Sequence, residues 1–231
     1  MFIPSMSRWL PAVLISCAPA LFAGDVTGDW SGQLTAEDGS RPIAFELRQT
    51  GNQVTGMLSF RAALLIEGAV EGNKLRLDGK AYSRTFHFEL ALNGNRLEGS
   101  AVMTMDGEKG KEASLGVSKL NSPASQNGLS GTWLATIEIA FNREMVRPVF
   151  TMRFDQQGSV IKGDMTDNDS HKIYPLSSVS MHGNSLVMTL VDKADTGRFE
   201  LVREGDKLTG KLIVTEESKT TSGRVTAVRQ I

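Results

Sequence analysis

The sequence predicts an all-β protein built from two tandem antiparallel up-and-down eight-stranded barrels. Three observations lead to this fold class. A hairpin pattern of twelve residues occurs four times, a Gly-x-Trp triplet opens each half of the chain, and equivalent positions in the two halves keep a regular spacing. With 40% hydrophobic and 22% charged residues among its 231 residues, the chain has an ordinary globular composition.

Each hairpin unit alternates apolar and polar residues on both sides of a central glycine. The pattern is large-apolar, x, apolar, three residues, Gly, polar, x, aliphatic, x, Gly, and the units are 45–56, 88–99, 152–163 and 199–210. An alternation with period two is typical of strands that have one face in water. The central glycine is expected to hold the positive φ of a tight turn. The second glycine lies inside the return strand, where it predicts a bulge or a sharp bend.

The spacing of landmarks indicates that the second half duplicates the first. The offset is 103 between Trp30 and Trp133, 107 between Gly56 and Gly163, and 111 between Gly99 and Gly210. Two short insertions in loops of the second half explain these steps of four residues. Beyond Gly210 we expect the offset to stay at 111, so that Val117 is equivalent to Val228.

Eight strands are expected in each half, in chain order. The first opens at the tryptophan, three hairpins supply six more, and the last lies near 113–119 or 224–229. Weaker turns at Gly72 and Gly183 complete the three hairpins of each half. Because successive strands are antiparallel neighbours, eight of them suffice to close a small barrel without exposed edges. The segment 60–66 fits either one helical turn or a strand.

The domain organisation follows from the duplication and the expected strands. We expect an export signal at 1–23, a first barrel at 24–121, a linker at 122–127 and a second barrel at 128–231. The linker is short and polar, and its proline would not suit a central strand.

The N-terminus has the features of an export signal. One positive charge at Arg8 precedes an apolar run at 9–17, and small residues follow at Ala18, Ala20 and Ala23. The apolar run is too short for a membrane-spanning helix. The predicted location of the protein is therefore the periplasm or the extracellular medium.

An alternative interpretation of the same segment is a lipid anchor. The sequence 14–17 is similar to a bacterial lipobox, and Cys17 is the only cysteine of the chain. Lipidation of Cys17 would hold the protein at the outer membrane, and only in that case is a membrane expected as a partner. Both alternatives stay open on the sequence, and neither leaves a disulfide in the folded part.

The residue pattern argues against several function classes. The formal net charge is −1 and there is no basic stripe, so nucleic acid is not an expected partner. No Gly-x-Ser-x-Gly, His-Glu-x-x-His or phosphate-loop motif occurs, so we expect a non-enzymatic protein without catalytic residues or cofactor. His87 and His182 are expected at the surface. His171 follows the acidic loop 164–169, but the glycine and distal glutamate of an EF-hand are missing, so no metal site is predicted.

The segments 26–30 and 129–133 resemble the opening strand of calycin barrels. Lipocalins carry Gly-x-Trp at this place, and avidin-type proteins carry Thr-Gly-x-Trp. The resemblance implies tandem up-and-down barrels, often with a pocket at one mouth, in an exported bacterial protein. Lipocalins also place a last-strand cation over the tryptophan, but the equivalent pairs here are Ser118 with Arg229 and Lys119 with Gln230. Only two tryptophans follow the signal, so the resemblance does not extend to biotin binding.

The barrel interior is the remaining candidate site. Its side chains could fill the axis as a packed core or line a calyx for one small ligand. The expected lining residues are Trp30, Phe45, Phe86, Phe88, Trp133, Met152, Phe154, Met188 and Phe199. We therefore expect an exported binding protein whose partner is a small apolar molecule. The alternative is a cell-envelope protein with filled barrels that acts through protein–protein contacts, in a structural or inhibitor-like role.

Overall fold

The computed structural model describes residues 24–81, 83–120, 128–141, 143–193, 195–216 and 219–230. Within these ranges every regular element is a β-strand, and no helix long and apolar enough to cross a membrane is found in them. The export signal at 1–23, Cys17 and the linker at 122–127 lie outside the described residues. The domain boundaries predicted from the sequence therefore stay a prediction.

The first eight strands form a closed barrel. They are β1 (Gly28–Ala36), β2 (Gly39–Thr50), β3 (Gln53–Ser59), β4 (Ala63–Glu71), β5 (Lys74–Ala81), β6 (Arg84–Asn93), β7 (Arg96–Met105) and β8 (Glu108–Lys119). Each strand is antiparallel to the next, and β8 returns to pair with β1. The segment 60–66 adopts the strand alternative, because β4 begins at Ala63 after a short bend.

The second half closes in the same way, with one interrupted strand. Its strands are β9 (Gly131–Phe141), β10 (Glu144–Val146), β11 (Val149–Gln157), β12 (Val160–Asp167), β13 (Ile173–His182), β14 (Ser185–Asp192), β15 (Asp195–Glu204), β16 (Lys207–Glu216) and β17 (Lys219–Arg229). β10 pairs with the end of β9 and β11 pairs with its start, so the two replace one strand broken at Pro148. β17 pairs with β9 and closes the barrel. The prediction of two tandem eight-stranded barrels is confirmed.

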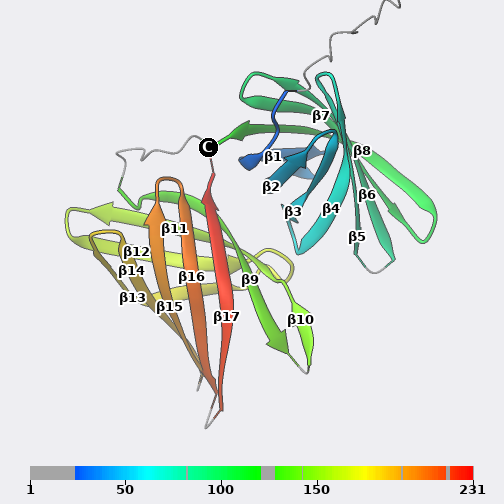
Figure 1. The fold of residues 1–231 in the computed structure, drawn as a ribbon. Helices are drawn as coiled ribbons and strands as arrows, with labels where there is room; N and C mark the ends of the chain where they lie inside the picture. Colours follow the sequence, from blue (N-terminus) through cyan, green and yellow to red (C-terminus); the bar gives the residue numbers. More distant parts are fainter. Residues whose placement is uncertain are drawn as a thin grey trace, which may run out of the picture.

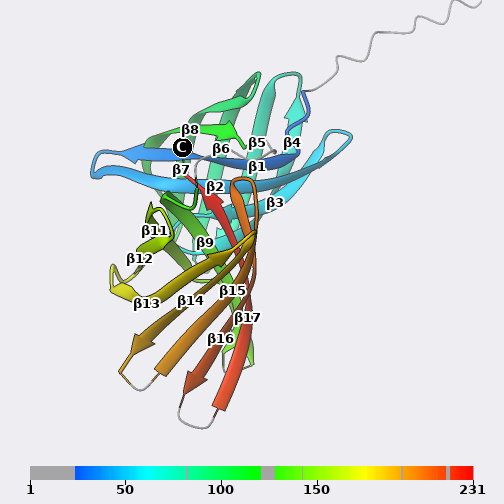
Figure 2. The same ribbon diagram turned by 90° about the vertical axis from the view of Figure 1, so that its left-hand side faces the viewer.

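The two barrels lie against each other with their strands in different directions. In Figure 1, β17 ends at the junction, beside the first barrel. Figure 2 shows β1 and β2 of the first barrel running across the direction of β16 and β17. The outer walls of the two barrels therefore meet at an angle.

The glycines of the hairpin pattern have two different roles. The central ones hold the predicted positive φ, which is 61° at Gly51, 62° at Gly94 and 62° at Gly205. Of the two alternatives predicted for the second glycine, a bulge or a sharp bend, the bulge is wrong, because strand pairing continues through Gly99 and its equivalents without a shift. At Gly99 a Cβ would lie 2.0 Å from the carbonyl oxygen of Glu89. The second glycine therefore permits a close approach of neighbouring strands.

Both predicted insertions are located in connections of the second barrel. The first lies between Trp133 and Met152, in the segment that contains β10. The second lies between Gly163 and Gly183, which includes the turn after β12 and a bulge in β13 between Leu176 and Ser178.

The equivalence expected for the last strands is wrong by one residue. The pairing of β7 with β8 shifts between Val102 and Thr104, because β8 contains one extra residue. The pairing of β16 with β17 has no such shift. Lys119 opposite Trp30 is therefore the equivalent of Arg229 opposite Trp133.

Each barrel has its own apolar core. One cluster of buried side chains includes Trp30, Phe45 and Phe88, and a separate cluster includes Trp133, Met152 and Phe199. Burial of these apolar surfaces is the main favourable contribution to folding, at roughly 25 cal/mol per Å². The strands alternate buried and outer residues as the sequence pattern predicts.

Each tryptophan is fixed by a hydrogen bond and a last-strand cation. The indole Nε1 of Trp30 donates to the carbonyl oxygen of Val26 at 2.9 Å, and that of Trp133 donates to Leu129 at 3.0 Å. Lys119 Nζ lies 5.6 Å from the centre of the Trp30 ring, and Arg229 Cζ lies 4.4 Å from the Trp133 ring. The predicted equivalence of Ser118 with Arg229 and of Lys119 with Gln230 was wrong, because the alignment of the last strands was displaced by one residue.

We predict that each tryptophan stabilises its own barrel. Trp30→Ala should destabilise the first barrel by about 3–5 kcal/mol, because truncating a buried aromatic leaves a cavity. Trp133 then reports on the second barrel and should keep blue-shifted, poorly quenched fluorescence at denaturant concentrations that unfold the first. Trp133→Ala should give the reverse result. Equal loss of stability in both barrels, or water-like emission from either tryptophan in the native protein, would contradict this role.

Candidate functional site

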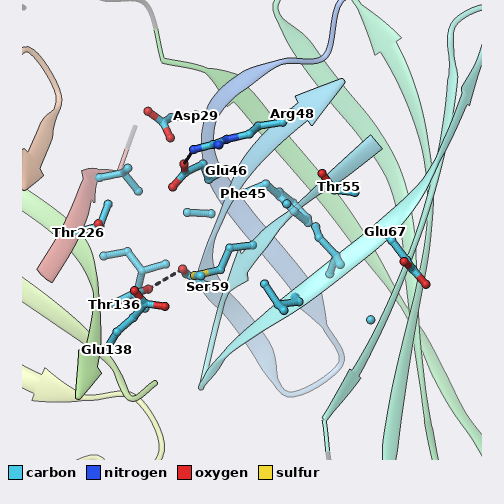
Figure 3. Close-up of a pocket in the computed structure, with 18 of the residues that line it drawn as sticks. Asp29, Phe45, Glu46, Arg48, Thr55, Ser59, Glu67, Thr136, Glu138 and Thr226 are labelled. Atoms are coloured by element: carbon cyan, nitrogen blue, oxygen red, sulfur yellow. Dashed lines mark hydrogen bonds and ion pairs between the residues drawn. The ribbon is translucent and has the colours of Figure 1, made fainter. Parts of the chain in front are cut away.

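A groove of about 700 Å³ lies between the two barrels. Its walls come from β1 to β6 in the first barrel and from β9 and β17 in the second. Figure 3 shows Thr136, Glu138 and Thr226 on one side and Ser59, Thr55 and Glu67 on the other. The groove therefore depends on both halves of the chain.

Strand alternation explains which side chains reach the groove wall. On β2, Phe45 and Leu47 are buried in the barrel core. The alternating residues Glu46 and Arg48 lie on the outer face. Pairing continues this outer layer across the sheet, with Glu46 opposite Met57. The same strands thus build the core with one face and the groove with the other.

An ion pair between the barrels lies beside the groove. Lys207 Nζ in the second barrel is 3.0 Å from both carboxylate oxygens of Asp29 in the first. The two side chains are only 26% and 23% exposed. Glu46 Oε2 lies 3.9 Å from the same Nζ. The lysine therefore bridges two carboxylates of the first barrel.

A second set of polar contacts joins the β3–β4 connection to the second barrel. The hydroxyls of Ser59 and Thr136 are 2.6 Å apart. The backbone N–H of Ala63 donates to the carbonyl oxygen of Arg147 at 3.0 Å. Asn168 Nδ2 donates to the carbonyl oxygen of Phe60 at 3.1 Å. Backbone groups of one barrel are thus satisfied by the other.

An apolar seam accompanies these polar contacts. Its members form one cluster from both barrels, namely Ala44, Leu134, Val149 and Val228, with Ala63 and Leu120 partly buried against it. Ala44, Leu134 and Val228 also line the groove. The groove therefore has an apolar side next to the contact between the barrels.

The wall of the second barrel carries a compensated carboxylate. Glu138 Oε1 accepts a hydrogen bond from Arg147 Nε at 2.9 Å, and its other oxygen lies 4.0 Å from Arg224. Glu138 and Arg224 lie opposite each other on β9 and β17. This side of the groove thus presents paired charges.

The wall of the first barrel carries carboxylates on neighbouring strands. Glu67 on β4 lies directly opposite Asp78 on β5, and both line the groove. His87 on β6 donates from Nδ1 to Asp78 Oδ1 at 2.7 Å, and its Nε2 lies 3.6 Å from Glu89. The hydrogen bond with Asp78 is the main cause that raises the pKa of His87 above its usual value.

The residues predicted to line a calyx lie in the two barrel cores. Eight of them are buried, and Phe86 is partly buried at the edge of the first core. Phe45 and Phe88 make an edge-to-face contact with ring centres 5.5 Å apart. The structure thus brings these residues together in two separate sets, and their role in holding a ligand stays a prediction.

A second hollow, of about 710 Å³, lies on the outer face of β1, β7 and β8. Its lining is mostly small or polar, and it includes the ion pair of Arg96 with Glu98 at 2.5 Å. All of its lining residues belong to the first barrel. The groove between the barrels is the better candidate because it combines an apolar side, charged groups and contributions from both halves.

The acidic loop after β12 has a structural explanation. Asp167 Oδ1 accepts hydrogen bonds from the backbone N–H groups of Asp169 and Ser170 at 2.8 and 3.2 Å. Aspartate in such a turn stabilises the backbone. In the part of the chain that the structure describes, no group of three or more His, Cys, Asp or Glu is arranged to hold a metal ion.

Sequence reasoning did not identify the groove. Most of its residues are outer-face positions of ordinary strands, such as Glu46, Met57 and Leu65, and they form no local motif. The one visible signal was Leu65, an apolar residue at a position where strand alternation places the side chain in water. Its side chain is 65% exposed.

Comparison with protein-family models and with curated proteins found no match. Among solved structures, isotype 1 transferrin binding protein B from serogroup B Neisseria meningitidis is similar at a TM-score of 0.33 and 9% identity, over 90% of this chain. The chain covers 58% of the length of that structure. Kievitone hydratase from Nectria haematococca is similar at a TM-score of 0.26 and 12% identity, over 88% of this chain and 89% of the other. Similarities at these scores carry no argument about function.

We predict a specific pH response at the edge of the groove. The raised pKa of His87 means that its pairing with Asp78 contributes stability below the usual value of about 6.5, and loses it as pH rises through the folded-state pKa. Asp78→Asn should lower the pKa of His87, as measured by NMR titration of the imidazole Cε1 proton. Glu89→Gln is the comparison and should have a smaller effect, since its carboxylate is more distant. An unchanged pKa in Asp78→Asn would contradict the assignment.

Proposed function

We propose that the chain is a non-enzymatic binding protein that acts through the groove between its barrels. The proposed partner is a segment of another protein, in the periplasm or outside the cell as the export signal predicts. The observation that carries the proposal is the groove itself, a hollow of about 700 Å³ with walls from both barrels. Its volume lies in the range of known binding pockets, which is about 300–1,000 Å³.

The mode of binding follows from barrel closure. Both barrels are closed, and apart from the three-residue strand β10, which pairs only with β9, each strand has a neighbour on both sides, so little free edge is offered to an added strand. Recognition must therefore use side chains on the outer wall. Leu65 and the partly buried Met57 offer apolar contact, and charged residues surround them. This combination of an apolar centre and a polar rim is the usual composition of a protein interface.

The packed barrel cores favour the groove, rather than a calyx inside a barrel, as the binding site. The side chains on each barrel axis form one packed apolar cluster. Interior packing at high density is the normal state of protein cores. A calyx ligand would have to displace these contacts, whereas the groove is already open.

Photo-crosslinking tests the proposal. A photoreactive amino acid at Leu65 should capture a partner protein in the native host, and the same group at Val160 should not. Val160 is a matched control, since it is an aliphatic residue on the outside of the second barrel with 57% exposure against 65%. The purified partner should then bind the wild-type protein, and Leu65→Asp should weaken its affinity by about tenfold or more, as for a central interface residue. Val160→Asp should leave the affinity unchanged.

Two results would overturn the proposal. One is equal capture from both positions. The other is a small apolar molecule found by native mass spectrometry at one copy per chain in protein from its own host, retained in Leu65→Asp. That second result would support the calyx.

A further inference from the structure

The outer face of β3, β4 and β5 carries an apolar row next to an acidic row. Met57 lies opposite Leu65. Two residues further along these strands, Glu67 lies opposite Asp78. On one face of a sheet such successive positions are neighbours. A long side chain lying on Leu65 would therefore end near the two carboxylates.

The two carboxylates are an unfavourable arrangement without a cation. Like charges directly opposite on neighbouring strands destabilise a sheet. Asp78 is partly compensated by His87. Glu67 has no ion-pair partner within 4.0 Å among the described residues, and its other cross-strand neighbour is Thr55. The pair is exposed to the groove, so an external cation has access to it.

We infer that the groove recognises a basic side chain, arginine or lysine, of the partner segment. Its aliphatic stem would pack on Leu65 and Met57, and its charged end would lie between Glu67 and Asp78. Arginine and lysine commonly cover apolar surface with their stems while the charged end stays in water. The guanidinium of arginine offers several donors in one plane, which suits two adjacent carboxylates. This inference rests on the proposed function and specifies its partner.

The overall charge of the groove agrees with this choice. Its lining includes five carboxylates, of Asp29, Glu46, Glu67, Asp78 and Glu138, against three basic groups, of Arg48, Lys80 and Arg224. Asp29 and Glu138 already have ion-pair partners between or beside the barrels. Glu46 is also paired, with Arg48 and Lys207, and Asp78 is paired with His87. Among the described lining residues, the carboxylate without an ion-pair partner within 4.0 Å is therefore that of Glu67, directly opposite Asp78.

A titration with a minimal probe tests the inference. N-acetyl-arginine amide should shift the backbone NMR signals of Leu65, Glu67 and Asp78 in a saturable manner, with a weak affinity of about tens of millimolar, because an exposed contact contributes little free energy. N-acetyl-citrulline amide has almost the same shape but no charge. Its affinity should be lower than that of the arginine compound by about tenfold or more. The double variant Glu67→Gln, Asp78→Asn should lose the response to arginine. Glu112→Gln removes an exposed carboxylate on β8, outside the groove, and should retain it.

The outcomes separate this inference from the proposed function. Equal shifts with citrulline, or arginine shifts that survive in the double variant, would overturn the basic-side-chain assignment. If a partner captured at Leu65 binds the double variant with unchanged affinity, the assignment is overturned and the proposed function stands. If arginine binds at Glu67 and Asp78 but position 65 captures no more than position 160, the carboxylate pair binds a basic group, but the proposed function fails and with it the assignment of that group to a partner segment.

Discussion

Two patches of contact hold the barrels against each other. These contacts fix the positions of the two outer barrel walls, and the groove lies between those walls. In one patch, Lys207 of the second barrel bridges Asp29 and Glu46 of the first. In the other, the connection between β3 and β4 hydrogen-bonds to Arg147 and Asn168. Each patch combines directional polar contacts with apolar burial in the seam. A directional contact fixes orientation as well as proximity, so the outer walls of the barrels become the two sides of a single site.

The interface also explains why the second half is not an identical copy of the first. Its two insertions include β10 with the following Pro148, and the turn that contains Asn168. Both contact the first barrel, since Pro148 forms an isolated bridge with Ala62 and Asn168 bonds to Phe60. In the second half, the position equivalent to Asp29 is Thr132, which has no charge. The ion pair of Asp29 with Lys207 is therefore not repeated. Duplication accounts for the barrels, and differences between the halves account for their junction.

The sequence alone predicted what depends on neighbouring residues. The period of two, the turn glycines and the repeat spacing predicted the strands, the hairpins and the closure of each barrel. The last-strand cations Lys119 and Arg229 were missed because one extra residue in β8 changes the register without leaving a motif. The groove was missed for a different reason. Residues such as Glu67 and Thr136 meet in one site only because contacts distant in the sequence place one barrel wall beside the other.

The central claim is that the groove is a fixed feature of the molecule, and a distance measurement between the barrels tests it most directly. Spin labels at Gln53 in the first barrel and Val160 in the second, with Cys17→Ser to avoid a third label, report the relative placement of the barrels by electron paramagnetic resonance. We predict a single narrow distribution of distances between the two labels when the contact residues between the barrels are unchanged. It should broaden when Asp29→Ala removes the ion pair with Lys207 and Ser59→Ala and Asn168→Ala remove the side-chain hydrogen bonds of the second patch. A broad distribution with both patches intact would contradict the account, because the two walls would then not form one site.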